Sequence, residues 1–520
     1  MNEILPSYLR GEWTVGTGTG VAIHDAITGE IVTHVSSEGL DFAGAVDFAR
    51  RVGGPALRAL SFAERAAVVK AAAGALAERK EELYELSARS GALVADAKVD
   101  VDGGFGTAIV FASVGRKTLP ASPFIVEGPV EQLGRDGTFV GQHLLTPLQG
   151  VAVQINAFNF PVWGMLQKLA PALLAGVPTL VKPATGTAHV AEHAVRIMVE
   201  SGVLPDGALQ LVSGSIPSVL DLLGGQDLVG FTGSAATAAT LRMHPAVVER
   251  SVRFTAEADS LNCTVLGPDV TPGDPEWDLF VAALTTEMIT KAGQRCTAIR
   301  RAFVPSSRLD DVADAVAEQL SKVVVGAPGH AGVTMGALVN MEQRVDVRAA
   351  IEQLKRDAKV VYGDVKRVDV VGGDPDVGAF QSPVLLRCDD IEATAPHEVE
   401  AFGPVATLMP YGDTSQLVDL IARGKGSLVG SLATHDTAFA RDVVLHAASH
   451  HGRFLLLDRE NGASSTGHGT PLPQLVHGGP GRAGGGEEEG GLRAVYHHMQ
   501  RTAIQAGPGM LAAILAGPAD

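Results

Sequence analysis

The chain has 520 residues, of which 46% are hydrophobic and 19% charged, and its formal net charge at pH 7 is -17. This composition is that of a globular protein with a large core, and the length suggests about three domains. The negative charge excludes the basic surface by which proteins bind nucleic acid. No apolar run reaches the roughly 18 residues of a membrane-spanning helix, and the first residues lack the pattern of a signal peptide.

The number and spacing of the cysteines indicate the redox environment in which the protein works. There are three, Cys263, Cys296 and Cys388, and they are far apart in the sequence. An odd number at wide spacing argues against a disulfide framework and favours a reducing environment. We therefore expect a cytoplasmic protein, in which Cys263 and Cys388 are small packing residues of the core.

The first 150 residues predict short strands, helices and an arm. Residues 1–50 read as short strands and turns, and an Ala-rich helical pattern runs from 41 to 92. Within it, Ser61 and Glu64 have the spacing of a capping box. Residues 122–148 mix β-prone and polar residues, which predicts an extended hairpin or arm.

From residue 150 to 257, short apolar strands alternate with helices of about a dozen residues. Single helices are expected over 161–175, 216–223 and 235–248. This alternation predicts a parallel sheet covered on both faces, as in a dinucleotide-binding fold. The usual Gly-x-Gly-x-x-Gly phosphate loop does not occur in the expected turn, so a nucleotide would be held in another way.

The second half predicts another α/β domain over residues 262–455, where the alternation is less regular. Residues 459–492 are rich in glycine and would by themselves read as a flexible linker. Residues 493–505 predict a mixed, strand-like segment.

Cys296 follows a predicted helix end in the sequence Thr-Thr-Glu-Met-Ile-Thr-Lys-Ala-Gly-Gln-Arg-Cys-Thr-Ala, residues 285–298. A break at Gly293 places the thiol beside Arg295, and a neighbouring cation favours the thiolate, which is the reactive form of cysteine. A lone cysteine is more often a core residue. The motifs elsewhere in the chain favour the reactive interpretation.

Five further motifs accompany that segment, four at the end of a predicted strand or the start of a helix and the last just before a predicted strand. They are Asn159-Phe160-Pro161, the segment 179–185, Phe231-Thr232-Gly233-Ser234, Phe254-Thr255-Ala256-Glu257 and Glu400-Ala401-Phe402-Gly403-Pro404. In this order they resemble the aldehyde dehydrogenase family over nearly the whole chain. The resemblance implies an α/β fold with a Rossmann-like cofactor domain, an α/β catalytic domain and a β oligomerisation arm.

The same resemblance implies catalytic roles. Cys296 would add to an aldehyde and hold the thioester that remains after hydride loss. The side-chain amide of Asn159 and the backbone N–H of Cys296 would stabilise the developing alkoxide. Glu257 would activate water for hydrolysis. Lys168 matches a family lysine that is sometimes assigned to a proton path.

Cofactor contacts are implied in the same way. Gly233 and Ser234 match the helix start that takes a pyrophosphate. Lys182 matches the residue that meets the adenosine ribose, and Glu400 the residue that holds the nicotinamide ribose. Ser215 is a further cofactor-site candidate.

Thr185 departs from the pattern of many NAD-using members, which have a glutamate three residues after the lysine. A carboxylate there would repel a 2′-phosphate, whereas a threonine hydroxyl can donate to one and Lys182 can pair with it. The sequence therefore predicts a preference for NADP.

Two other segments point to the substrate. Glu257-Ala-Asp-Ser-Leu-Asn262 and His477-Gly-Gly-Pro-Gly-Arg482 differ from the common family forms. Both resemble the branch that oxidises CoA-linked semialdehydes in aerobic aromatic and benzoate degradation. Some members carry an additional hydratase domain, and the length of 520 residues favours a stand-alone dehydrogenase.

We expect a cofactor domain over residues 1–124 and 150–259 and a catalytic domain over 260–460. The arm, 125–149 with 493–520, would pair with a second subunit, because an exposed strand-forming arm is otherwise prone to aggregate. A homodimer is the expected assembly.

Several features carry no assigned role. His497 and His498 lack further ligands at suitable spacing, so no metal is expected. Glu488 aligns loosely with a family glutamate near the active-site entrance, within a charged run, 487–489, that otherwise reads as a solvated face. Three alternatives stay open: a CoA-acylating dehydrogenase, a catalytically silent binding protein of the same fold, and a thiol acyltransferase that uses Cys296 without a cofactor.

Overall fold

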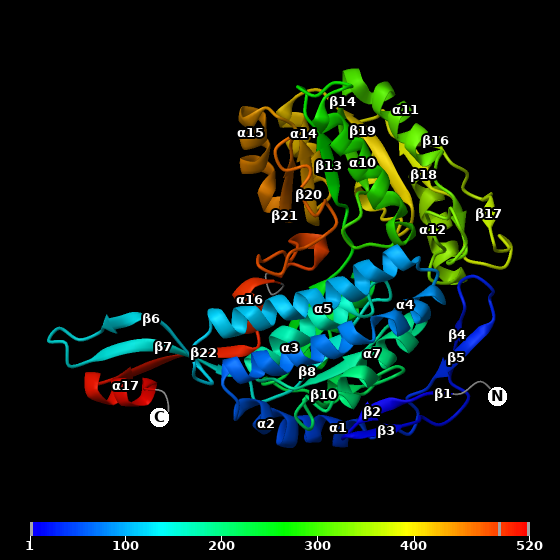
Figure 1. Cartoon of the computed structure of the whole chain (residues 1–520). Helices are drawn as coiled ribbons and strands as arrows, with labels where there is room; N and C mark the ends of the chain where they lie inside the picture. The colour runs from blue at the N-terminus through cyan, green and yellow to red at the C-terminus, as the bar shows by residue number, and fades with distance from the viewer. Residues whose placement is uncertain (1–3, 487–489, 517–520) are drawn as a thin grey trace.

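The chain forms two lobes, each built on a seven-stranded sheet, with an arm projecting from one of them (Figure 1). This computed structural model describes residues 4–486 and 490–516. A long loop of the C-terminal part, coloured orange to red, runs between the lobes.

The sheet of the first lobe has the strand order β12-β11-β8-β9-β10-β2-β3. Its strands are β2 (Ser7–Leu9), β3 (Glu12–Thr14), β8 (Ala152–Ile155), β9 (Thr179–Lys182), β10 (Leu209–Leu211), β11 (Leu228–Thr232) and β12 (Arg253–Glu257). The five strands from β12 to β10 pair in parallel, and β2 joins β10 antiparallel. The predicted parallel sheet is thus confirmed, and it brings the carboxyl ends of β8, β9, β11 and β12 to one edge.

Helices cover both faces of this sheet. They are α1 (Phe42–Phe48), α2 (Gly54–Arg58), α3 (Phe62–Glu78), α4 (Lys80–Ala88), α5 (Val94–Lys117), α6 (Trp163–Ala175), α7 (Ala188–Glu200), α8 (Ala235–Arg242) and α9 (Pro245–Val248). The predicted capping box is present at the start of α3, where Ser61 Oγ accepts from Glu64 N and the Glu64 carboxylate accepts from Ser61 N.

Two predicted helices of this lobe were wrong. Residues 235–248 form two helices rather than one, because Pro245 has no N–H to continue α8 and instead begins α9. Residues 216–223 contain one short 3-10 turn, Leu220–Leu222, in place of an α-helix. A small sheet of β1 (Ile4–Leu5), β5 (Ile31–Val35) and β4 (Val21–His24) flanks the lobe.

The second lobe has the strand order β16-β18-β19-β14-β13-β20-β21. Its strands are β13 (Cys263–Leu266), β14 (Arg301–Pro305), β16 (Lys359–Tyr362), β18 (Val384–Arg387), β19 (Val405–Tyr411), β20 (Ser427–Ala433) and β21 (His451–Leu457); β15 (Val325–Gly326) and β17 (Val370–Val371) pair separately. The helices are α10 (Pro275–Ile289), α11 (Leu309–Leu320), α12 (Met341–Leu354), α13 (Ala395–Glu398), α14 (Thr414–Ala422) and α15 (Thr437–Ala447). All strands except the edge strand β16 run parallel.

The arm joins two distant parts of the chain. Its sheet contains β6 (Ile125–Gln132), β7 (Val140–Pro147) and β22 (Met499–Ala506), and β22 pairs with β7 along its full length. Helix α16 (Gly491–Tyr496) precedes β22 and α17 (Pro508–Leu515) follows it, so the predicted strand-like end is a strand between two helices. The domain boundaries proposed above stay a prediction.

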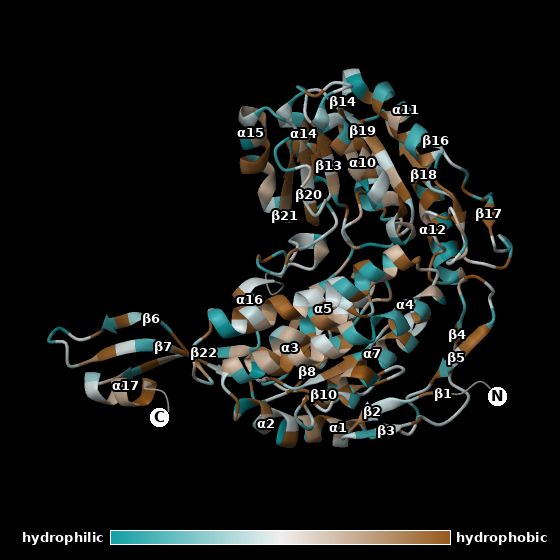
Figure 2. Ribbon diagram, in the orientation of Figure 1, coloured by the Kyte–Doolittle hydropathy of each residue, from teal (hydrophilic) through white to brown (hydrophobic). Residues whose placement is uncertain are grey.

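The interiors of both lobes are apolar, and Figure 2 shows brown strands inside a partly teal layer of helices. Cys263 and Cys388 are fully buried, as expected of packing residues. No helix in the described residues is long and apolar enough to cross a membrane.

Candidate active site

A left-handed turn presents Cys296. Helix α10 ends at Ile289, and Lys291, Ala292 and Gly293 follow with φ angles of 50°, 50° and 68°. A Cβ on Gly293 would lie 2.1 Å from Gly403 O, so glycine is required there for space as well as for conformation. The turn ends the helix and directs the following residues toward the space between the lobes.

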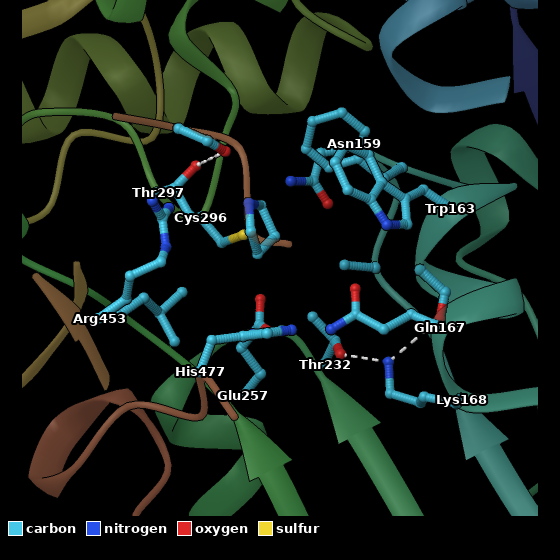
Figure 3. Close-up of a pocket in the computed structure, with 16 residues that line it drawn as sticks. Asn159, Trp163, Gln167, Lys168, Thr232, Glu257, Cys296, Thr297, Arg453 and His477 are labelled. Atoms are coloured by element: carbon cyan, nitrogen blue, oxygen red, sulfur yellow. Dashed lines mark hydrogen bonds between the residues drawn. The ribbon is translucent and has the colours of Figure 1, made fainter. Parts of the chain in front are cut away.

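Cys296 lines a cavity with the other predicted catalytic residues (Figure 3). Glu257 is the last residue of β12, Asn159 lies in the β8–α6 loop, and Lys168 lies on α6. These residues meet because β8, β11 and β12 are parallel neighbours that end at the same edge. The structure therefore brings all four predicted catalytic side chains to one cavity.

Lys168 is tied to the strand ends rather than to solvent. Its Nζ donates to Thr232 Oγ1 at 2.6 Å and to Asn156 Oδ1 at 3.3 Å. It also lies 3.4 Å from Gly164 O. These contacts exclude the plain surface lysine, and its part in proton transfer stays a prediction.

The arginine next to Cys296 in the sequence has another partner, and two other arginines, Arg453 and Arg300, interact with Cys296 through their charge. Arg295 Nη1 lies 3.0 Å from Glu287 Oε1, and both side chains are about 5% exposed, so a buried carboxylate compensates this arginine. Arg453 of β21 lines the cavity with Cys296 and donates through Nη2 to His468 O at 2.6 Å. Burial lowers the pKa of Arg453 to about 10, which still leaves it cationic at neutral pH.

Sequence reasoning missed Arg453, and with it Trp163 and Gln167, which come from α6 to line the same cavity. The signal for Arg453 was available, because it is an arginine within the apolar strand sequence His-Gly-Arg-Phe-Leu-Leu-Leu. A charged residue in such a strand needs a buried partner or a functional reason.

A second hollow, a groove, adjoins the cavity, and Asn159, Glu257 and Cys296 line both. The predicted cofactor residues that line this groove are Lys182, Thr185, Gly233, Ser234 and Glu400. Ser215 is not among them. It is exposed, and its Oγ lies 3.3 Å from Ser37 Oγ, because the chain after β10 turns toward the N-terminal segment.

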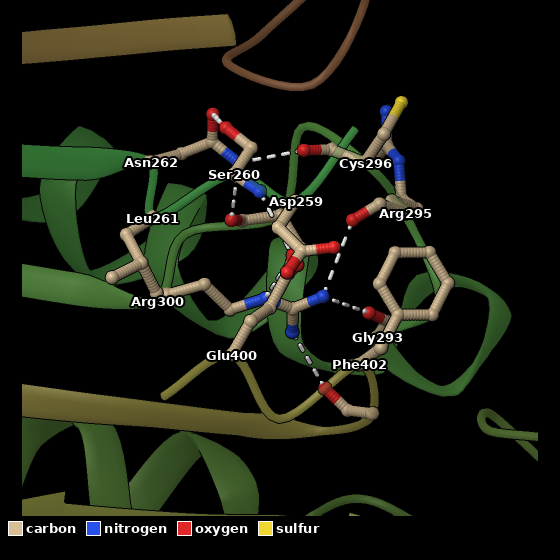
Figure 4. A network of polar contacts seen from close by, with 12 residues as sticks. Asp259, Ser260, Leu261, Asn262, Gly293, Arg295, Cys296, Arg300, Glu400 and Phe402 are labelled. Atoms are coloured by element: carbon tan, nitrogen blue, oxygen red, sulfur yellow. Dashed lines mark hydrogen bonds and ion pairs between the residues drawn. The ribbon is translucent and has the colours of Figure 1, made fainter. Parts of the chain in front are cut away.

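One carboxylate oxygen of Glu400 has no hydrogen-bond partner among the described residues. Ser260 N donates to its Oε2 at 3.2 Å, whereas Oε1 is buried, accepts no hydrogen bond from any described residue and lies 3.7 Å from Arg300 Nε (Figure 4). Burial raises the pKa of Glu400 to about 7. An unsatisfied carboxylate oxygen in the groove suits a donor such as a ribose hydroxyl.

The adenosine side of the groove suits the same ligand. Burial lowers the pKa of Lys182, an effect that a phosphate or hydroxyl partner would offset. Ser234 caps α8 by accepting from Thr237 N at 3.2 Å, which leaves the start of this helix at the groove wall. The residues present therefore fit a dinucleotide.

Two other expectations concern residues away from these hollows. Glu488 lies outside the described residues, as does the run 487–489. Burial lowers the pKa of His498 to about 3 and that of His497 to about 4. Among the described residues, no group of three or more His, Cys, Asp or Glu side chains could hold a metal ion.

Comparisons with known proteins agree with this geometry. The sequence model of the aldehyde dehydrogenase family matches residues 13–466, so the chain belongs to that family. It is an oxidoreductase that acts on aldehydes. The 3,4-dehydroadipyl-CoA semialdehyde dehydrogenase of Aromatoleum evansii is 46% identical to it, over 92% of this chain and 93% of the relative.

More distant proteins share the fold. An N-succinylglutamate 5-semialdehyde dehydrogenase of Paraburkholderia xenovorans is 30% identical over 92% of each chain. A betaine aldehyde dehydrogenase of Staphylococcus aureus, solved in complex with NAD+, superposes with a TM-score of 0.84 at 22% identity, covering 97% of this chain and 96% of that one. The expected aldehyde dehydrogenase fold is thus confirmed.

Proposed function

We propose that this protein is an NADP-dependent dehydrogenase that oxidises a CoA-linked semialdehyde to the carboxylic acid during aerobic degradation of benzoate or related aromatic compounds. The observation that carries the proposal is the convergence of Cys296, Asn159 and Glu257 in one cavity that adjoins the groove lined by Lys182, Thr185 and Glu400. The relative at 46% identity supports 3,4-dehydroadipyl-CoA semialdehyde as the first substrate to test. Three cysteines that form no disulfide among the described residues suit a cytoplasmic reaction.

The chain's own residues account for each covalent step. The Cys296 thiolate adds to the aldehyde carbon, and the resulting oxyanion accepts hydrogen bonds from the Asn159 amide and the backbone N–H of Cys296. NADP held by Lys182, Thr185 and Glu400 would supply a hydride acceptor, and the loss of hydride from this adduct would leave a Cys296 thioester. Glu257 then takes a proton from the water that attacks the thioester carbon, and the acid and the thiolate are released. One aldehyde and one water yield one acid, a hydride and a proton.

Thr185 carries the choice of NADP over NAD. We expect Thr185→Glu to shift the ratio of kcat/KM for NADP to that for NAD toward NAD by roughly tenfold or more. The new carboxylate would repel the 2′-phosphate, and a repulsion of about 1.4 kcal/mol corresponds to a factor of ten. Thr185→Gln is the matched control, since it has the size of glutamate without the charge. A wild-type preference for NAD would contradict the assignment.

The substrate class can be tested directly. CoA-linked and free aldehydes of the same length are compared by the absorbance of the reduced dinucleotide, with and without added CoA. We expect turnover of the CoA-linked aldehyde without free CoA, because Glu257 in the cavity serves hydrolysis. A requirement for free CoA would instead identify the acylating alternative, and no dinucleotide reduction with any aldehyde would favour a silent binding protein or a cofactor-free acyltransferase.

The arm provides the surface for assembly. Its strands, the loop between β6 and β7 and the helix that packs on them expose large apolar side chains, namely Val126, Val130, Leu133, Phe139, Met510 and Ile514. A second copy that covers these side chains would give the expected homodimer. Sedimentation velocity of the wild type and of Phe139→Asp tests this, and a monomeric wild type would contradict it.

A further inference from the structure

Asp259 holds the start of helix α8 from inside the cofactor groove. It lies two residues after Glu257, lines the groove, and its Oδ1 accepts a hydrogen bond from Ala235 N at 2.8 Å. Ala235 is the first residue of α8, whose N-cap is Ser234. The N–H groups of the first turn and the helix dipole make this end attractive to an anion. In this structure, the anion at Ala235 N is a side chain of the protein itself.

In the proposed function, a pyrophosphate binds at the same helix start. A phosphate oxygen and a carboxylate oxygen would accept the same hydrogen bond there. One N–H cannot serve both at full strength. In addition, two anions that approach within a few ångströms in a partly buried groove repel each other. An incoming dinucleotide must therefore displace the Asp259 carboxylate or bind beside it at a loss of affinity.

Arg482 offers the displaced carboxylate a second partner. Its Nη2 lies 4.0 Å from Asp259 Oδ2, and the same nitrogen donates to Glu398 O at 2.9 Å. Arg482 belongs to the glycine-rich segment after His477, and its side chain is 19% exposed. The main-chain contact fixes the guanidinium, so a rotation of the Asp259 side chain alone would bring the two charges together.

A second carboxylate, that of Glu400, acts on Asp259, and Arg482 is close enough to act on Glu400 as well. Glu400 is close enough for the charge of Asp259 to raise its pKa, in addition to the larger effect of burial (Figure 4). Arg300 faces Glu400 and compensates it in part. Asp259 therefore lies between a helix start that attracts it, a carboxylate that repels it and an arginine that can receive it.

We propose that Asp259 competes with the dinucleotide pyrophosphate for the N-terminus of α8, and that Arg482 holds the Asp259 side chain when it is displaced. This inference rests on the proposed function. The competition weakens cofactor binding and speeds release of the reduced cofactor, and product release limits turnover in many enzymes. Asp259 is thus a residue that sets cofactor affinity rather than one that contacts the reacting atoms.

Cofactor binding without aldehyde tests the proposal. The full-length protein is titrated with NADPH while tryptophan-to-nicotinamide energy transfer is recorded, and the release rate is measured by stopped-flow displacement. We expect Asp259→Asn to lower Kd about tenfold and to slow release by a similar factor, because the amide oxygen can still accept from Ala235 N but carries no charge. Asp259→Ser is a second neutral variant. Asp314→Asn on the exposed face of α11 is the matched control for a lost negative charge and should leave Kd unchanged.

Arg482 is tested in the same assay through a double-mutant cycle. Arg482→Met should raise Kd in the wild-type background, where the displaced Asp259 loses its partner, and have much less effect when Asp259 is already asparagine. An equal effect in both backgrounds would show that Arg482 contacts the cofactor directly, which would overturn its part in the proposal.

The remaining outcomes separate the two claims. If the wild type binds NADPH and both neutral variants bind it equally or more weakly, the competition by Asp259 is refuted and the proposed function stands. If neither the wild type nor the variants bind NADPH or NADH, the proposed function fails and the inference fails with it.

Discussion

Gly293 is the residue whose replacement tests most directly how the backbone presents the nucleophile. Its φ of 68° is in the left-handed region, and an added Cβ would lie 2.1 Å from Gly403 O and 2.7 Å from Pro404 N. Gly403 O cannot easily retreat, because it accepts from Arg300 Nη1 at 2.8 Å, and the same guanidinium donates through Nη2 to Gly293 O at 2.9 Å. Gly293→Ala should therefore displace the turn and Cys296 with it.

The size of the effect follows from two separable contributions. A left-handed φ costs an alanine roughly 1–2 kcal/mol, and the smaller entropy of the unfolded chain returns about 0.4–1 kcal/mol. Forcing a methyl group into a packed site costs a further 1–3 kcal/mol or so. Gly202 has a φ of 67°, and no described atom beyond its chain neighbours lies within 4 Å of the point that a Cβ would occupy, so Gly202→Ala carries the backbone contribution alone.

The assay compares the two variants. Urea unfolding should show Gly293→Ala to be less stable than Gly202→Ala by about 1–3 kcal/mol, the packing contribution. The rate of Cys296 alkylation by iodoacetamide and the burst of reduced dinucleotide should fall in Gly293→Ala and not in Gly202→Ala. Equal stability of the two variants, together with a wild-type burst in Gly293→Ala, would refute this account of the turn.

Three further predictions concern the polar groups around the nucleophile. Glu257→Gln should leave a single burst of reduced dinucleotide but reduce steady turnover by at least 100-fold, within the range of about 10² to 10⁴ for a general base, and an unchanged steady rate would contradict its role. Arg453→Gln should slow the alkylation of Cys296 at pH 7 by about tenfold, because the thiolate loses a neighbouring cation, whereas Arg453→Lys should restore most of the rate. Burial raises the pKa of Glu400 from 4.5 to about 7, so the folded state binds this proton more tightly than the unfolded chain does. The contribution of Glu400 to the free energy of unfolding is therefore full below about pH 4.5 and is lost as the pH rises to about 7. Glu400→Gln should remove that loss in urea titrations at pH 5 and pH 7.5, and a pH dependence equal to that of the wild type would contradict the shift.

The sequence predicted the site better than it predicted its electrostatics. Asn159, Glu257 and Cys296 were found through their motifs, which together resemble the aldehyde dehydrogenase family; the local pattern around each residue alone favoured a structural role. Arg295 was chosen as the cation for Cys296 because it is the adjacent residue, yet its side chain turns to Glu287. Arg453 lies more than 150 residues away and reaches the cavity only because β21 lies beside β20 at the edge of the second sheet.

A helix boundary and the glycine-rich segment show the same difference between what local sequence patterns predict and what distant contacts decide. The break at His244-Pro245 was readable from the proline, although the pattern of apolar residues suggested one helix. The glycine-rich segment 459–492 reads as a linker in sequence, but its residues Gly469, Pro471 and His477 line the cavity. What such a loop contacts depends on the two lobes that enclose it, and no local periodicity carries that information.

By itself, the sequence determined most of the strands and helices of the first lobe, its parallel sheet and the residue types available for thiol chemistry, because hydrophobic periodicity, glycine and proline act over a few residues. Only the tertiary structure decided which charges meet: Arg453 and Arg300 act on the thiol, Arg295 pairs with Glu287, and Asp259 lies at the start of α8. Pairing between groups far apart in the chain depends on distances of a few ångströms, and these exist only once the sheets and loops have packed.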